Sequence, residues 1–383
     1  MPFPTLPAFG ASCARFRPIL LLAAAAGCAG ESDPTGPADF ARASRATNLA
    51  ATTTVVMSNL NAPRGLAWGP EGALHVVETG TSAVTGPCAT VYRGTNCYSG
   101  TGSVSRLWRG QQERVVEGLP STYNAATLDI GGAQHISFQG RGNMQVTVGW
   151  GGAPSARAQL GALAEGFGSL LQIRPSGGWR VEADVSAFEE AENPAGGPLD
   201  SNPFGVLAEA GRSYVADAGA NSLLEVAANG GVSLVAIFPP VPVAPGPFNP
   251  PFAVSEPVPT GVTRGPDGAL YVATLTGVPF LPGAASVYRV VPGAAPTIFA
   301  TGFTQLTDLA FGPDGSLYVV QYASAPFFGG PGALIRIAPN GARTTIAADL
   351  PRPTGVIVGD DGAVYVSVNG NAEGVGEVRR IIQ

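Results

Sequence analysis

The chain contains no lysine, and all 21 of its basic residues are arginine. This absence excludes a lysine nucleophile and the phosphate-binding loop that ends in Gly-Lys. Charged residues are also scarce, at 13% of the chain, and the net charge is −6. A nucleic-acid partner needs clustered cations on one face, so we expect no nucleic-acid partner.

Recognisable catalytic motifs are missing as well. The sequence has no Gly-x-Ser-x-Gly, His-Glu-x-x-His, EF-hand or Cys-x-x-Cys motif, and only two histidines. His75 occupies a position that tyrosine fills in the other copies of a repeat described below, which favours a packing role. His135, near a predicted strand start, is the one histidine we consider for acid–base chemistry, with a structural role as the alternative.

What the chain has in abundance is repetition. One pattern joins a short apolar strand, a Gly-Pro-Asp-Gly-like turn and a second β-rich strand, and therefore predicts a hairpin. Its copies span residues 63–77, 259–273, 307–320 and 353–366, with a looser copy at 203–216. The last two intervals, from Gly261 to Asp308 to Gly355, are each about 47 residues, a period typical of propeller blades.

Six copies of a third strand follow the hairpins, and a degenerate hairpin at 136–148 supplies the missing member. The sixth copy has no fourth strand after it, whereas the strand-like segment 52–58 precedes the first hairpin. We therefore predict an all-β fold over residues 51–383: a six-bladed β-propeller, closed by pairing of the N-terminal strand into the C-terminal blade.

The first 50 residues predict export. Arg15 and Arg17 precede a short apolar run that ends at Cys28, and a polar, proline-bearing stretch follows. We interpret residues 1–28 as a lipoprotein-type signal with Cys28 as the lipidated residue, and residues 29–50 as a disordered linker. Plain secretion is the alternative. Either way, we expect the mature protein in the bacterial cell envelope or outside the cell, touching a membrane only through a lipid anchor.

Two cysteines remain after the signal. Cys88 and Cys97 are separated by a loop-like stretch in an oxidising compartment. A disulfide that staples this loop is the favoured interpretation, and a two-cysteine metal site is the alternative.

The predicted insertions gather in one class of connection. Neighbouring strands of a blade are antiparallel, so the loops 79–101, 149–167, 189–202 and 239–257 should lie on one face, opposite the short turns. Long loops on a rigid scaffold commonly carry binding sites. Polar residues at strand ends on that face are the candidate ligand-binding residues: Arg64, Glu78, Asp129, His135, Asn202, Asp217, Asn221, Asp308, Gln321 and Asn369. Their carboxylates suit Ca²⁺, although no cofactor is firmly implied.

Several motifs resemble the ScyD/ScyE family of exported propellers. They include Asn61-Ala-Pro-Arg-Gly-Leu-Ala67, the Cys88 and Cys97 region, Asn202-Pro-Phe-Gly205 and Tyr214-Val-Ala-Asp-Ala-Gly-Ala-Asn221. The resemblance covers about residues 50–383 and implies an exported propeller without an established activity. Gln321 and Thr274 depart from it, since relatives tend to have Glu there. More broadly, the repeats are similar to propellers of the TolB, NHL and gluconolactonase kind.

Three functions follow as hypotheses. The first is a binding or interaction module whose loop-rich face holds a small molecule, glycan or protein. The second is a metal (Ca²⁺)-dependent hydrolase or lyase of the gluconolactonase-like class, with His135 or Glu78 as the base. The third is a structural scaffold of the envelope.

Overall fold

The computed structural model describes residues 51–140, 142–243 and 254–383. The predicted signal (1–28), its Cys28 and the predicted linker (29–50) lie outside these residues. The described chain is nearly all-β, with one α-helix, α1 (Val185–Glu192), and one 3₁₀ segment, η1 (Pro154–Ala164). Neither helix is long and apolar enough to cross a membrane.

Six four-stranded antiparallel sheets follow the sequence repeat. The first sheet comprises β2 (Pro63–Trp68), β3 (Leu74–Glu78), β6 (Gly102–Trp108) and β7 (Gln111–Leu119). The second comprises β10 (Ala133–Gln139), β11 (Asn143–Val148), β12 (Ser169–Ile173) and β13 (Trp179–Asp184). The third comprises β14 (Pro203–Glu209), β15 (Arg212–Asp217), β16 (Ser222–Ala227) and β17 (Val232–Ile237). The fourth sheet comprises β20 (Pro259–Arg264), β21 (Leu270–Thr274), β22 (Ala285–Val290) and β23 (Thr297–Phe303). The fifth comprises β24 (Leu306–Phe311), β25 (Leu317–Gln321), β26 (Gly332–Ile337) and β27 (Arg343–Leu350). The sixth comprises β28 (Gly355–Val358), β29 (Val364–Val368), β30 (Gly376–Ile382) and β1 (Thr52–Leu60).

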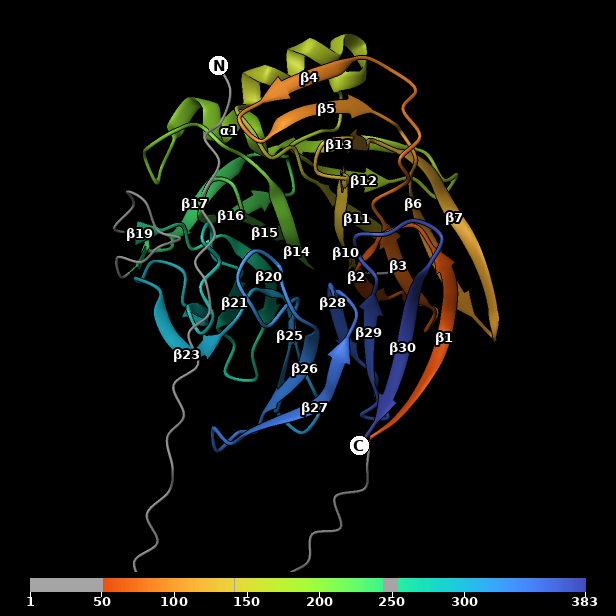
Figure 1. Ribbon diagram of the computed structural model, residues 1–383, viewed down its shortest axis with the longest axis vertical. Helices are drawn as coiled ribbons and strands as arrows, with labels where there is room; N and C mark the ends of the chain where they lie inside the picture. Colours follow the sequence, from red (N-terminus) through yellow and green to blue (C-terminus); the bar gives the residue numbers. More distant parts are fainter. Residues whose placement is uncertain (1–50, 141, 244–253) are drawn as a thin grey trace, which may run out of the picture. The chain divides into compact units, whose positions relative to one another are not determined.

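The first strand of each sheet contacts the first strand of the next. The contacts run in the order β2, β10, β14, β20, β24 and β28, and β28 contacts β2 again. Figure 1 shows the labelled inner strands β2, β10, β14, β20 and β28 near the middle, with β7, β13, β17, β23, β27 and β1 at the outside. The segment predicted as an N-terminal strand is β1, and it pairs antiparallel with β30, Thr52 opposite Ile382 and Met57 opposite Val378.

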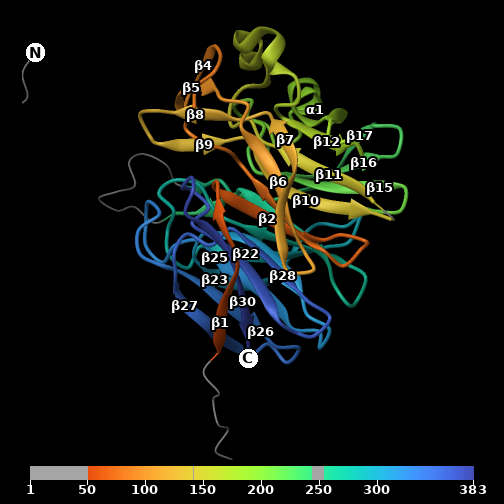
Figure 2. The same ribbon diagram turned by 90° about the vertical axis from the view of Figure 1, so that its right-hand side faces the viewer.

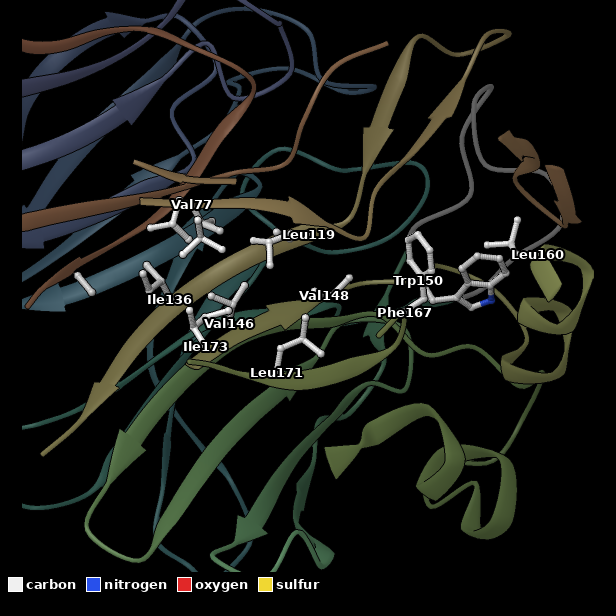
Figure 3. Close-up of a cluster of buried hydrophobic side chains, with 14 of the residues drawn as sticks. Val77, Leu119, Ile136, Val146, Val148, Trp150, Leu160, Phe167, Leu171 and Ile173 are labelled. Carbon is white, nitrogen blue, oxygen red and sulfur yellow. The ribbon is translucent and has the colours of Figure 1, made fainter. Parts of the chain in front are cut away.

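The hydrophobic core is divided among the spaces between sheets. Along β21, Leu270 and Val272 pack toward the sheet that begins with β14, whereas Tyr271 and Ala273 pack toward the sheet that begins with β24. Strands buried on both faces need continuous apolar sequence, which explains the unbroken Leu-Tyr-Val runs of the repeat. Figure 3 shows one such cluster, between the first two sheets, continuing through Trp150 and Phe167 to Leu160 of η1.

The repeated turn has a fixed backbone requirement. In the first copy, Gly69 donates its N–H to the carbonyl of Ala73, and Gly72 donates to the carbonyl of Gly69. Gly72 has φ 76°, and its counterpart Gly268 has φ 79°. Glycine adopts this left-handed conformation without a steric penalty, so the final glycine of the motif sets the tight connection.

The predicted loop 79–101 and the β7–β10 connection, which was not predicted to be long, join in a sheet that the repeat does not predict. Strands β4 (Cys88–Val91) and β5 (Gly94–Tyr98), from the β3–β6 connection, pair with β8 (Thr122–Asn124) and β9 (Asp129–Gly131), from the β7–β10 connection. The predicted disulfide is confirmed: Cys88 and Cys97 are directly opposite each other, with Cα atoms 3.9 Å apart. Figure 2 shows this sheet on the side of the molecule where α1 and η1 also lie. A smaller pair, β18 (Val241–Pro242) and β19 (Val254–Ser255), lies in the β17–β20 connection.

Candidate functional site

Three of the predicted site residues share one structural role. Glu78, Asp217 and Gln321 end the second strands of their sheets, and each side chain accepts a backbone N–H from the segment before the first strand. The donors are Asn61 at 2.7 Å, Asn202 at 2.6 Å and Thr304 at 2.9 Å. These side chains therefore fasten the loop-side ends of two strands together.

Glu78 is the most heavily bonded of these residues. It is fully buried. Besides the Asn61 N–H, its carboxylate accepts the hydroxyls of Ser103 at 3.1 Å and Ser105 at 2.6 Å, and pairs with Arg114 at 3.1 Å. With all its oxygens bonded inside the sheet, Glu78 is positioned as a structural group and not as an exposed base.

Asp217 is likewise saturated. Its Oδ1 accepts the N–H groups of Asn202, Gly219 and Ala220, and its Oδ2 accepts the Ser201 hydroxyl at 2.7 Å. Burial raises the pKa of Asp217 to about 6, against the lowering effect of these hydrogen bonds.

His135 and Asp308, 173 positions apart in the sequence, meet in the structure. The Nε2 of His135 on β10 lies 3.3 Å from Oδ2 of Asp308 on β24. Because β10 and β24 are not neighbours in the order of inner strands, this pair reaches across the middle of the ring of contacts. Asp308 also accepts the N–H of Val356 on β28 at 2.9 Å, while Nδ1 of His135 is buried without a partner.

The remaining predicted residues are dispersed over the same side. Asn221 accepts the N–H of Val258 at 3.1 Å, and Asn369 donates to the carbonyl of Val375 at 2.9 Å. Asp129 is exposed at the start of β9. Arg64 donates to the Thr79 hydroxyl at 3.2 Å, and burial lowers its pKa while nearby Tyr322 and Asp129 oppose that shift.

Arg64 lies near a group of residues that were not among the predicted site residues. Burial raises the pKa of Tyr322, and the charges of Arg64 and Arg352 oppose the rise. The Arg352 guanidinium lies over the Tyr322 ring, 5.3 Å from its centre. Aromatic contacts extend this group outward: the Tyr322 ring is 5.7 Å from that of Phe328, and the Phe328 ring is 4.4 Å from that of Phe280.

We call this group the aromatic–arginine patch, and it comprises Arg64, Phe280, Tyr322, Phe327, Phe328 and Arg352. Phe327 is 54% exposed and Phe328 38%. Phe280, Phe327 and Phe328 all have positive φ, between 52° and 58°. Bulky residues rarely adopt this conformation, so the loops present these rings at a local energetic cost. In the sequence, this patch could have been recognised from Phe280, Phe327 and Phe328, three large aromatic residues in loops that otherwise consist mostly of small residues.

The two sides of the molecule differ in chemistry. On the long-loop side, exposed apolar side chains come from seven of the connections: Val84, Tyr92, Leu128, Leu163, Val254, Val278, Phe327, Phe328 and Val375. Beside the short turns, the exposed apolar side chains are Trp108 and Val291. On the short-turn side, the acidic residue of the repeated turn pairs with an arginine of the third strand. These ion pairs are Glu71–Arg106, Asp267–Arg289, Asp314–Arg336 and Asp361–Arg380.

Calcium was the one cofactor considered from the sequence. Within residues 51–140, 142–243 and 254–383, no three His, Cys, Asp or Glu side chains are grouped so as to hold a metal ion. The carboxylates of Glu78 and Asp217 accept N–H and O–H groups instead. The carboxylate oxygens of Glu78 and Asp217 are therefore already occupied by hydrogen bonds within the protein.

No protein-family model and no curated protein matches the sequence. Among solved structures, the chain is similar to a catalytically inactive virginiamycin B lyase from Staphylococcus aureus with quinupristin (TM-score 0.50, 12% identity, 87% of this chain and 99% of that one). It is also similar to a luciferin-regenerating enzyme (TM-score 0.50, 10% identity, 87% and 95%) and to a putative gluconolactonase (TM-score 0.48, 12% identity, 86% and 91%). The first two likenesses, together with the radial sheets, show that the fold is a β-propeller.

Proposed function

We propose that the chain is an exported, six-bladed propeller of the ScyD/ScyE type that binds a ligand through its long-loop side. The six repeat-derived sheets are its blades, and the β1–β30 pairing closes the ring. Support comes from the cyclic contacts of the inner strands and from the pairing register. The pairing covers the edge that β30 would otherwise present to other chains.

Exposed apolar side chains are more frequent on the long-loop side than beside the short turns: nine of the 17 in the described residues lie there, against Trp108 and Val291 on the opposite side. The acidic residues of the short turns are instead paired with arginine. Contiguous exposed apolar surface with a polar border marks interaction sites on soluble proteins. The long-loop side is therefore the binding side.

The aromatic–arginine patch indicates the kind of ligand. Its phenylalanine and tyrosine rings offer faces and edges for stacking, and the Arg352 guanidinium lies over the Tyr322 ring. Aromatic stacking favours a flat apolar group, and arginine favours a carboxylate or phosphate. A small molecule that combines a ring with an acidic group matches both features.

A thermal-shift titration tests this assignment. We expect an aromatic carboxylate such as indole-3-acetate to raise the melting temperature, because a ligand at about 100 times its Kd stabilises by about 2.7 kcal/mol. Neutral indole should have a weaker effect. Arg352→Gln should weaken carboxylate binding about tenfold or more, since a charge-assisted contact is lost. Arg343→Gln is the matched control, because Arg343 stacks on Phe303 of an outer strand. If no aromatic acid shifts the melting temperature, or if both variants respond alike, the assignment is wrong.

A lyase or hydrolase is the second candidate function. The His135–Asp308 pair favours it, because an imidazole held by a carboxylate is the usual arrangement of a general base. Turnover of lactones or esters by the wild type, lost in His135→Gln and unchanged by EDTA, would support catalysis without a metal. Binding without turnover would favour the binding module.

The export proposal rests on the N-terminal sequence and has its own test. Expressed with its signal in a bacterial host, the wild type should fractionate with membranes, and Cys28→Ala should move to the soluble fraction because the lipid anchor is lost. Cys13→Ala, inside the same segment, is the control and should remain with membranes. Membrane association of both variants would contradict lipidation at Cys28.

A further inference from the structure

A second group of residues on the long-loop side has an excess of negative charge. Asp200, before β14, acts on the carboxyl groups of Glu189 on α1 and of Glu256 after β19, and Asp217 at the end of β15 also acts on Glu189. Burial raises the pKa of Glu189 to about 7, and the charges of Asp217 and Asp200 add to the rise. Burial also raises the pKa of Glu256, again with a contribution from Asp200. These four carboxyl groups form what we call the acidic pocket.

One guanidinium of the chain already contacts this pocket. The turn between β4 and β5 extends Tyr92 and Arg93 to Asp200: the Tyr92 hydroxyl donates to Oδ2 at 2.6 Å, and Nη2 of Arg93 donates to the same oxygen at 3.1 Å. The charge of Arg93 also acts on Glu256. The chain itself therefore shows that Asp200 accepts a guanidinium.

Two carboxyl oxygens in the pocket are left without partners. Oδ1 of Asp200 and Oε2 of Glu189 are buried, in residues that are 6% and 2% exposed, and neither accepts a hydrogen bond from the residues that the structure describes. A buried polar atom without a partner costs about 1–3 kcal/mol, and more when it is charged. Asp217 differs, because its two oxygens are saturated by the backbone and Ser201. The unmet acceptors therefore belong to Asp200 and Glu189.

We infer that the acidic pocket binds an organic cation, a guanidinium or a primary ammonium group, through Asp200 and Glu189. Such groups carry several N–H donors and can therefore donate to more than one carboxyl oxygen at once. The inference does not depend on the aromatic–arginine patch, which contributes none of these residues.

Arg93 acts as an internal competitor in this arrangement. Its side chain is 49% exposed, whereas that of Asp200 is 8% exposed, so Arg93 reaches a buried carboxylate from the surface. An arriving cation replaces or joins Arg93 at Asp200 and fills the unmet acceptor of Glu189. Without a ligand, Glu189 is expected to hold a proton near neutral pH, which reduces the repulsion with Asp200 and Asp217.

Calorimetric titration of the folded protein with agmatine, which carries one guanidinium and one ammonium group, tests the inference. At pH 8 we expect saturable binding that Glu189→Gln weakens at least tenfold. Glu190→Gln, on the exposed neighbouring position of α1, is the matched control and should bind like the wild type. Arg93→Ala should bind agmatine more tightly, because the internal competitor is absent. This variant keeps the test decisive if Glu189→Gln does not fold.

The pH dependence separates this site from nonspecific attraction. Agmatine stays doubly charged from pH 8 to pH 5.5, whereas Glu189 gains a proton over that range, so affinity should fall at least about tenfold. Glu189→Gln should lose most of this dependence. Equal binding by the two glutamine variants, no binding by either wild type or Arg93→Ala, or binding of Ca²⁺ but not agmatine would overturn the inference.

Discussion

Glu78→Ala is expected to lower the free energy of unfolding by about 3–5 kcal/mol, because it breaks a buried ion pair from one side. The substitution leaves the Asn61 N–H, two serine hydroxyls and the Arg114 guanidinium without their acceptor. It also releases the loop before β2 from the end of β3. Urea denaturation monitored by tryptophan fluorescence measures the change.

The same arginine supplies a control for this prediction. Glu117 lies 3.8 Å from Arg114, and its side chain is 75% exposed. An exposed ion pair contributes little, so Glu117→Ala should change the free energy of unfolding by no more than about 0.5 kcal/mol. A loss below about 1 kcal/mol for Glu78→Ala would contradict its assignment as the fastener of the first sheet.

Removing residues 51–60 is expected to abolish cooperative unfolding of the propeller, or to lower its melting temperature by more than about 10 °C. The deletion takes away β1, exposes the edge of β30, and removes the fully buried Met57 and Leu60. Burial of each such side chain contributes about 2–5 kcal/mol, and the free edge favours aggregation. Calorimetry and size-exclusion chromatography report both effects.

Single substitutions on β1 show whether the loss comes from packing. Met57→Ala should cost about 2–5 kcal/mol, whereas Val55→Ala, at a position 47% exposed on the same strand, should cost less than about 1 kcal/mol. A truncated protein that unfolds cooperatively near the wild-type temperature would show that the ring does not need β1.

The repeated hairpins could be predicted because their turn chemistry is local. Glycine at the left-handed position and apolar residues on both faces occur in each copy, so spacing alone locates β2–β3, β20–β21, β24–β25 and β28–β29. The repeats also contain the ion pairs of the short turns, in which an acidic turn residue pairs with an arginine of the third strand. To predict such a pair, the turn has to be compared with the third strand of the same copy, as for Asp314 and Arg336.

The loop structures were beyond this kind of reasoning. In the β4–β5–β8–β9 sheet, two irregular loops are joined by the pairing of Cys97 with Tyr123. No periodic pattern in the sequence predicts this pairing. Helix α1 begins at Val185, where Asp184 caps it by accepting the Ala187 N–H, and its last turn falls within the predicted loop 189–202. Both features depend on tertiary contacts more than on local preference.

For the candidate site residues too, some features could be predicted from the local sequence and others depend on tertiary contacts. Their placement on one side followed from strand direction, but their partners did not. Glu78 and Asp217 fall at ligand-like positions in the sequence and are saturated by hydrogen bonds in the structure. His135 and Asp308 are 173 positions apart and meet because their strands face each other across the ring. Phe280 and Phe328 occupy different loops that only the fold brings into contact.

Because β4, β5, β8 and β9 form one shared sheet, some loops of the long-loop side tolerate changes of length or sequence less well than others. A change of length in the Cys88–Cys97 hairpin shifts Tyr92 and Arg93 away from Asp200 and disturbs the pairing of Cys97 with Tyr123. The loops that carry Phe280 and Phe328 touch through ring contacts and have no such cross-strand tie. Grafting foreign loops to redirect recognition should therefore begin at residues 275–284 and 322–331, leaving the cysteine-clasped portion as the fixed part of the scaffold.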